Sequence, residues 1–288
     1  MQQPYPAPAV PGAVRTRPLG PASTQVSVIG QGTWRVRDPT KATEAIREGI
    51  RLGLTHIDTA ELYEDNSRSE TMLGTALQGH REEVFLASKV LPRNASYDGT
   101  IAACDASLRR LGTDHLDLYY LHWRGDHPLE ETMDAMAQLV EDGKVRHVGV
   151  SNFEPEGLDE AEALLGKGVL AANQVLYHLE DRGAESEVLP WCKRHGVTLV
   201  AYSPFGAGSF LQSAKARAAV EKASNATGLS LRQVALAFLV RDPAVVAIPK
   251  AEAVAHVRDN AGGDADLPEE VVAQLDEAFP VRRGLRTV

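Results

Sequence analysis

The stretch HIDTAELY, residues 56–63, decides the fold together with two later runs, VFLASK at 84–89 and LDLYYLH at 116–122. Each run is rich in β-forming and apolar residues and carries a chemically active side chain at or just beyond its C-terminal end. Parallel strands that close into a barrel bring these ends to one face, where barrel enzymes place their chemistry. An acid, a phenol, an ammonium and an imidazole are therefore expected in one pocket: Asp58, Tyr63, Lys89 and His122.

Eight strand-like runs alternate with amphipathic helical patterns along the chain. The expected strands cover residues 29–34, 56–60, 84–90, 116–122, 145–151, 173–177, 198–204 and 245–249. The helical patterns between them include ATEAIREGIRLG, which stops at Gly53, and also IAACDASLRRLG, EETMDAMAQLVEDG and EPEGLDEAEALLG. Eight strand–helix units favour an α/β fold of the (β/α)8 TIM-barrel type. A doubly wound Rossmann fold is the nearest rival, but Gly30-Gln31-Gly32 lacks the third glycine of its phosphate-binding turn.

Three segments depart from the plain repeat. TQVSV, residues 24–28, predicts a short N-terminal β-hairpin that plugs the bottom of the barrel. The long stretch 203–230 is expected to be a functional loop that carries a helix of its own. The spacing of Ser67 and Glu70 is that of a capping box at the start of a helix.

Length and composition restrict the class of protein. A chain of 288 residues suits one large α/β domain or two small ones, and a net charge of −9 disfavours nucleic-acid binding. No apolar run approaches the ~20 residues of a membrane helix. The distant Cys104 and Cys192 indicate reduced thiols in a cytoplasmic protein, expected to be a monomer or a weak oligomer. Residues 1–17 are expected to form a flexible Pro-rich tail, and residues 18–288 the barrel.

The four active side chains can cooperate as a proton donor. A tyrosine has a pKa near ~10, which is too high for efficient proton donation at neutral pH. Lys89 next to Tyr63 would favour the phenolate, and Asp58 could hold Lys89 in place and charged. His122 could donate a hydrogen bond to a substrate oxygen. Each residue alone also fits a structural role, as a loop cap, a packed aromatic or a core histidine.

Two other chemistries were weighed from the residues. The nine histidines include no HxH or HExxH spacing, so no metal site is expected. Lys89 could instead be the Schiff-base lysine of an aldolase, since such lysines also lie at barrel strand ends. That alternative leaves Tyr63 and His122 less well explained.

Short motifs in a characteristic order cover residues from about 18 to 279. They are Gly32-Thr33-Trp34, Asp58-Thr59-Ala60 with Tyr63, Ser88-Lys89, Leu121-His122-Trp123, Gly149-Val150-Ser151-Asn152-Phe153, Asn173-Gln174, Tyr202-Ser203-Pro204, and Ile248-Pro249-Lys250 followed by His256 and Asn260. In these motifs the chain resembles the aldo-keto reductase superfamily, in its bacterial type with a short C-terminal loop. The resemblance implies NADPH-dependent, reversible reduction of aldehydes or ketones, with Tyr63 as the proton donor and Asp58, Lys89 and His122 around it.

The resemblance also implies a cofactor site for NADPH, with NADH as an alternative. Its candidate residues are Gly32, Thr33, Trp34, Asp58, Ser151, Asn152, Gln174, Tyr202, Ser203, Pro204, Phe205, Lys250, His256 and Asn260. Among them Tyr202 matches the aromatic ring that stacks on the nicotinamide, and Lys250 matches a residue near the adenosine 2′-phosphate. A phosphomonoester dianion needs a cation, which suits the lysine.

The chain departs from the family pattern at several positions. Ala251 replaces a Ser or Thr that adds a phosphate contact, and His256 replaces an Arg, so only a moderate preference for NADPH is expected. Glu64 replaces a glycine after Tyr63. Trp34 and Trp123 are expected to wall a pocket for a small carbonyl substrate, together with Tyr63 and His122. A nucleotide-sensing regulatory subunit on the same fold, similar to potassium-channel β-subunits, remains an alternative.

Overall fold

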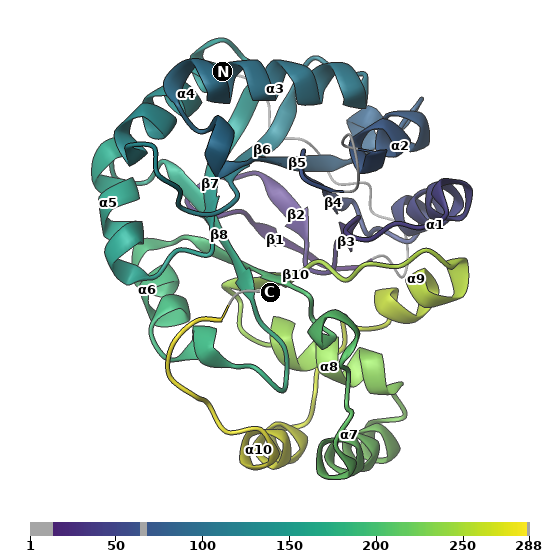
Figure 1. The fold of residues 1–288 in the computed structure, drawn as a ribbon. Helices are drawn as coiled ribbons and strands as arrows, with labels where there is room; N and C mark the ends of the chain where they lie inside the picture. The colour runs from purple at the N-terminus through teal and green to yellow at the C-terminus, as the bar shows by residue number, and fades with distance from the viewer. Residues whose placement is uncertain (1–13, 64–67, 287–288) are drawn as a thin grey trace.

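A single curled sheet of eight parallel strands forms the centre of the molecule (Figure 1). The computed structural model describes residues 14–63 and 68–286. In sheet order the strands are β3 (Gln31–Gly32), β4 (His56–Asp58), β5 (Phe85–Val90), β6 (Leu116–Leu121), β7 (Val145–Ser151), β8 (Leu170–Leu176), β9 (Thr198–Tyr202) and β10 (Val245–Ala247). Backbone hydrogen bonds from Gly30 N–H to Ala247 O (2.8 Å) and from Gly32 N–H to Pro249 O (3.1 Å) join the first strand to the last. The predicted (β/α)8 barrel is confirmed.

Helices surround this sheet on its outer side (Figure 1). They are α1 (Pro39–Arg51), α2 (Arg68–Ala76), α3 (Tyr97–Leu111), α4 (Leu129–Glu141), α5 (Pro155–Leu165), α6 (Val188–His195), α7 (Ala214–Thr227), α8 (Leu231–Val240), α9 (Val254–Ala261) and α10 (Glu269–Ala278). Their ends follow local chemistry: the Asp38 carboxylate accepts from the N–H groups of Thr40 and Lys41, and α3 stops where Gly112 takes the left-handed conformation (φ 65°).

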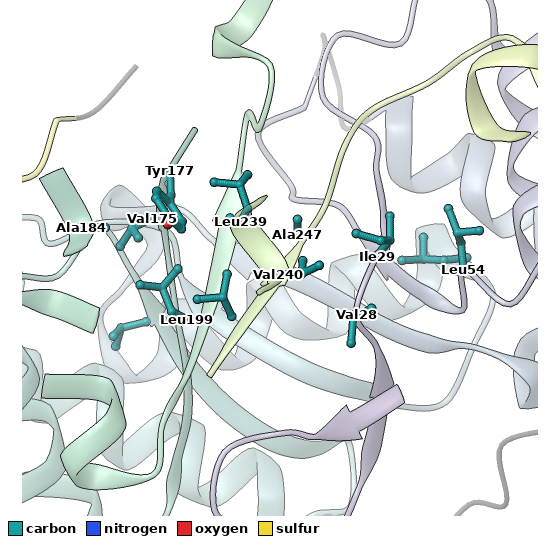
Figure 2. Close-up of a cluster of buried hydrophobic side chains, with 14 of the residues drawn as sticks. Val28, Ile29, Leu54, Val175, Tyr177, Ala184, Leu199, Leu239, Val240 and Ala247 are labelled. Carbon is teal, nitrogen blue, oxygen red and sulfur yellow. The ribbon is translucent and has the colours of Figure 1, made fainter. Parts of the chain in front are cut away.

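The larger apolar core lies between the strands and these helices. Figure 2 shows part of it, with Leu199 of β9 and Ala247 of β10 among side chains that include Leu239 and Val240 of α8. Strands that are covered on their outer face by helices and on their inner face by each other are apolar on both sides. This explains why the strand sequences read as nearly continuous apolar runs.

The predicted hairpin is present. β1 (Thr16–Pro18) pairs antiparallel with β2 (Gln25–Ser27). Its buried Leu19 and Val26 belong to a second, inner cluster with Phe85 and Leu118, so the hairpin fills the bottom of the barrel as expected.

The predicted limit of the tail at residue 17 is corrected by this hairpin. Val14 is buried, and Arg15 forms ion pairs with Asp264 (2.7 Å) and Asp266 (2.9 Å). The ordered chain therefore includes residues 14–17, because strand β1 and an ion-pair cluster hold them. Residues 1–13 lie outside the described residues. Glu64 and Ser67, the first residue of the predicted capping box, also lie outside them.

Strand limits differ from the expected ones mainly at the C-terminal ends. Strand pairing ends two residues early in 56–60, 198–204 and 245–249, and β3 is only two residues long. At the other end, β8 begins at Leu170, three residues before its expected start. The chain leaves the sheet there to line a pocket. In the long stretch 203–230, helix α7 confirms the expected helix. Within the described residues, none of the helices has the length and apolar character of a membrane span.

Candidate active site

Three of the four predicted active side chains are in direct contact at the C-terminal ends of β4 and β5. The Lys89 ammonium donates to Asp58 Oδ1 (2.5 Å), to the Thr59 carbonyl (2.8 Å) and to the Tyr63 hydroxyl oxygen (3.2 Å). It also lies 5.0 Å from the centroid of the Tyr63 ring. Parallel register brings these groups together, because Asp58 is level with Ala87, two residues before Lys89.

The Lys89–Asp58 pair is fully enclosed. Lys89 has no exposed surface, and Asp58 has 1%. Burial lowers the pKa of Lys89, and the Asp58 carboxylate opposes that shift. The second carboxylate oxygen of Asp58 accepts from Gln174 Nε2 at 2.8 Å. A buried charge of each sign is therefore matched by the other and by additional hydrogen bonds, which is what such a pair requires.

His122 lies against Tyr63 on the pocket side. Its ring centroid is 5.9 Å from that of Tyr63, in an edge-to-face arrangement, and 4.7 Å from that of Trp123. Burial lowers the pKa of His122 to about 3, and the Lys89 charge acts in the same direction. The imidazole is therefore neutral at physiological pH, and it can act as a hydrogen-bond donor without carrying a charge.

An amide-rich wall adjoins these residues at the ends of β7, β8 and β9. Asn152, which directly follows β7, takes the left-handed conformation (φ 62°). Its Nδ2 donates to Ser151 Oγ (3.1 Å) and to the His122 carbonyl (3.2 Å), and its Oδ1 accepts from the Tyr202 hydroxyl (3.0 Å). Ser151 Oγ donates to the Gln174 carbonyl at 2.8 Å. These side chains hold one another in fixed positions.

A pocket of about 510 Å³ opens above this cluster. Its lining residues are Gly32, Thr33, Trp34, Asp58, Leu62, Tyr63, His122, Trp123, Arg124, Ser151, Asn152, Gln174, Tyr202, Ser203, Ile248 and Lys250. Most of the predicted site residues are therefore brought together. Leu62, Arg124 and Ile248 were not among the predicted site residues. Leu62 directly precedes Tyr63, Arg124 directly follows Leu121-His122-Trp123, and Ile248 is the first residue of the motif Ile248-Pro249-Lys250.

Five predicted site residues do not line this pocket. Lys89 lies behind Tyr63 and Asp58, and Pro204 is not in contact with the space. Phe205 packs against Phe210, with ring centroids 5.2 Å apart. His256 is exposed on α9. Asn260 is buried, and its Oδ1 has no hydrogen-bond partner among the described residues.

Lys250 has a partner that sequence reasoning did not identify. Its ammonium donates to Glu252 Oε1 at 2.5 Å, and the same oxygen accepts from the Arg37 backbone N–H at 2.8 Å. Burial opposes ionisation of Glu252, yet the hydrogen bonds from Lys250 and Arg37 lower its pKa overall. Glu252 is thus a fixed carboxylate beside the only lysine of the pocket wall among the described residues.

In residues 14–63 and 68–286, no group of three or more His, Cys, Asp or Glu side chains could hold a metal ion. The two cysteines, Cys104 and Cys192, are buried and not joined to each other.

Comparison with known proteins agrees with this geometry. The model of the aldo/keto reductase family matches residues 28–279. Methylglyoxal reductase YeaE of Escherichia coli (strain K12) is 46% identical over 262 residues, which are 89% of this chain and 92% of that protein. Glyoxal reductase of Bacillus subtilis (strain 168) is 34% identical over 254 residues, 86% of this chain and 87% of that protein.

Solved structures give the same result. An aldo/keto reductase from Klebsiella pneumoniae in complex with NADP and acetate superimposes with a TM-score of 0.88 at 42% identity, covering 97% of this chain and 100% of that one. An aldo-keto reductase of the same organism in complex with NADPH has a TM-score of 0.88 at 41% identity, covering 96% and 100%. The chain therefore belongs to the aldo/keto reductase family of oxidoreductases.

Proposed function

We propose that this protein reduces small aldehydes or ketones to alcohols with NADPH in the cytoplasm, and that Tyr63 supplies the proton. The observation that carries the proposal is the contact of the Tyr63 hydroxyl with a buried ammonium, Lys89, at the wall of a pocket that His122 also lines. The names of the relatives, methylglyoxal reductase and glyoxal reductase, support a small dicarbonyl as the substrate.

The pocket residues fit a nicotinamide cofactor. Ser151, Asn152 and Gln174 offer hydroxyl and amide groups for a carboxamide, and the Tyr202 ring offers a face for stacking. Lys250 offers a cation for a phosphate. Outside the pocket lining, the buried Asn260 Oδ1 has no hydrogen-bond partner among the described residues, and we propose that it accepts from the exocyclic amine of a base. When bound, the reduced nicotinamide supplies the hydride.

The protein's own residues handle the proton. Tyr63 lies where it can donate its hydroxyl proton to the substrate oxygen, and the Lys89 ammonium at 3.2 Å stabilises the phenolate that remains. Asp58 holds Lys89 in this position. Neutral His122 orients the carbonyl with a hydrogen bond. In the reverse direction the phenolate accepts a proton from the alcohol.

The position of Lys89 argues against the aldolase alternative. A Schiff-base lysine must reach the substrate carbonyl with an uncharged amine. Here the ammonium is enclosed behind Asp58 and Tyr63, donates to three acceptors, and does not line the pocket. Its role is therefore to act through Tyr63.

The test is NADPH oxidation with methylglyoxal, with the alcohol product identified by NMR, in the wild type and in Tyr63→Phe. Loss of the proton donor should lower kcat by roughly 10²–10⁴-fold. The dissociation constant for NADPH should stay nearly unchanged, because the ring is kept.

Near-normal turnover in Tyr63→Phe would remove Tyr63 from the mechanism. Tight NADPH binding by the wild type without any turnover, across a panel of aldehydes and ketones, would favour the nucleotide-sensing subunit. A covalent adduct on Lys89 after borohydride treatment with substrate would move the protein to the Schiff-base class.

A further inference from the structure

The carboxylate of Glu252 is paired with Lys250, the cation that the proposed function assigns to a phosphate. Its Oε1 is held by the Lys250 ammonium (2.5 Å) and by the Arg37 N–H (2.8 Å), so it connects the segment after β10 to the segment before α1. The Glu252 side chain is 21% exposed and that of Lys250 is 31% exposed. This is a half-buried, anchored ion pair and not a mobile surface contact.

A 2′-phosphate and this carboxylate compete for the same ammonium. A dianion bound at Lys250 would lie within a few ångströms of a second negative charge, and like charges at that distance repel. The phosphate must therefore either share Lys250 with Glu252 or displace Glu252 from Lys250. Either arrangement costs part of the binding free energy that the lysine provides. A free ribose carries no such charge.

The same carboxylate suits an unphosphorylated ribose. Adjacent 2′- and 3′-hydroxyl groups are donors, and in the unrelated Rossmann fold an acidic side chain that accepts from the 2′-hydroxyl recognises NAD. Glu252 Oε1 accepts from Lys250 and from the Arg37 N–H, and the carboxylate also takes a hydrogen bond from the Asp38 backbone N–H. A carboxylate offers about four lone-pair sites, so one remains for a ribose hydroxyl. Glu252 can therefore accept a hydrogen bond from the 2′-hydroxyl of NADH, a group that NADPH lacks because its 2′-oxygen carries the phosphate.

The neighbouring residues do not compensate the charge. Ala251 has no donor side chain. Arg258 on α9 is committed to Glu48 at 2.6 Å, and His256 on the same helix is exposed and outside the pocket lining. Arg37 and Asp38, whose backbone N–H groups bond to Glu252, bring one side-chain charge of each sign to this place. Among the described residues of α9 and of the segment after β10, the charge at Lys250 is therefore set by its pairing with Glu252.

We propose that Glu252 is the specificity-determining residue for the cofactor: it weakens the binding of the 2′-phosphate at Lys250 and accepts a hydrogen bond from the ribose of NADH, so that this enzyme accepts both cofactors. The proposal rests on the proposed function, since it assigns the 2′-phosphate to Lys250.

The experiment measures dissociation constants of NADPH and NADH by quenching of tryptophan fluorescence, because Trp34 and Trp123 line the pocket. The adenine-side fragments 2′,5′-ADP and 5′-AMP are measured by calorimetry, since they differ only in the 2′-phosphate. The proteins are the wild type, Glu252→Gln, Lys250→Met and a control, Asp105→Asn. Asp105 forms a similar half-exposed pair with Lys144 (2.7 Å) that does not line the pocket.

Glu252→Gln keeps the size of the side chain and removes its charge. It should tighten NADPH and 2′,5′-ADP by roughly tenfold or more, about the size of one charge-assisted hydrogen bond. It should weaken NADH and 5′-AMP by only about a few-fold, because the glutamine amide oxygen can still accept a neutral hydrogen bond from the ribose. Lys250→Met should weaken NADPH and 2′,5′-ADP and leave NADH nearly unchanged. Asp105→Asn should leave all four constants as in the wild type.

Equal changes for the phosphorylated and unphosphorylated ligands in Glu252→Gln, or no change at all, would overturn the inference while the proposed function stands. A strong preference of the wild type for NADPH that does not grow in Glu252→Gln would do the same. If neither NADPH nor NADH binds the wild type, the proposed function fails and this inference fails with it.

Discussion

The two ends of strand β4 carry buried polar side chains that differ in their hydrogen-bond partners. His56 and Asp58 are two residues apart, face the same side and are both buried. At the N-terminal end, both ring nitrogens of His56 lack a hydrogen-bond partner among the described residues, and the ring meets Phe85 edge-on at 5.3 Å. At the C-terminal end, Asp58 accepts from Lys89 and from Gln174.

The difference lies in what compensates the cost of burial. At the N-terminal end of β4, burial lowers the pKa of His56 to about 4, so the ring stays neutral and packs against Phe85. At the top, Asp58 and Lys89 form an ion pair that additional donors and acceptors satisfy. Burial alone therefore does not identify a functional group. The informative feature is a buried charge whose partners the fold supplies.

The largest expected effect comes from breaking the pair at the top. Lys89→Met keeps the approximate length of the side chain but removes the charge that, in the proposed function, stabilises the Tyr63 phenolate, so kcat should fall by roughly 10²–10⁴-fold. It also leaves Asp58 as a buried carboxylate without its cation, which should cost about 3–5 kcal/mol of unfolding free energy in urea titrations.

The double variant Asp58→Asn/Lys89→Met separates the two effects. It removes both charges, so most of the stability should return while activity stays absent. If the double variant is as unstable as Lys89→Met, the loss is due to packing and not to an unpaired charge.

A packing change at the bottom should affect stability without affecting chemistry. Leu19→Ala removes an apolar side chain of the hairpin that fills the barrel, and should cost about 2–5 kcal/mol in urea unfolding. Because the pocket lies at the other end, kcat and KM should stay within about twofold of the wild type at a temperature where the variant is folded. Leu164→Ala, at a site with 38% exposure, is the control and should cost far less.

His56 should make the protein sensitive to acid. Its pKa is about 4 in the folded chain and near 6.5 in the unfolded chain, so the unfolded chain binds more protons between these values. Stability therefore rises with pH in this window and falls as the solution is acidified, by about 2 kcal/mol between pH 7 and pH 5 from His56 alone.

His56→Leu removes that titration, so its unfolding free energy should depend less on pH by that amount, as measured in urea titrations at both pH values. His256→Gln, at an exposed position, should keep the pH dependence of the wild type. An unchanged slope in His56→Leu would show that His56 is not a buried neutral ring. His122 acts in the same direction and remains in both variants.

The smallest expected effect concerns the pH dependence of kcat/KM, to which ionisation of His122 should contribute nothing near neutral pH. His122 has its pKa lowered to about 3, so its charge does not change between pH 5 and pH 8. The profile of kcat/KM against pH should therefore show no step near 6.5 that depends on His122. A step there in the wild type that disappears in His122→Gln would mean that the imidazole is charged during turnover.

The alternation of apolar runs with amphipathic helices was enough to predict the barrel, because both periodicities are local properties of the chain. The same runs placed Asp58, Lys89 and His122 at strand ends, and a parallel sheet brings such ends together without further information. The hairpin at 24–28 and the helix inside 203–230 were also predicted from local patterns. The limit of the N-terminal tail was not, since Arg15 is held by Asp264 and Asp266 at the other end of the chain.

Only the tertiary structure decided which polar groups are partners. Gln174 meets Asp58 across 116 residues because β8 and β4 close into one barrel. Glu252 takes Lys250 and the Arg37 N–H because the segment after β10 lies against the segment before α1. The sequence shows that Lys250 is present after the last strand, but not which carboxylate pairs with it. That depends on distances of a few ångströms between segments far apart in the chain, and electrostatic interactions change strongly over such distances.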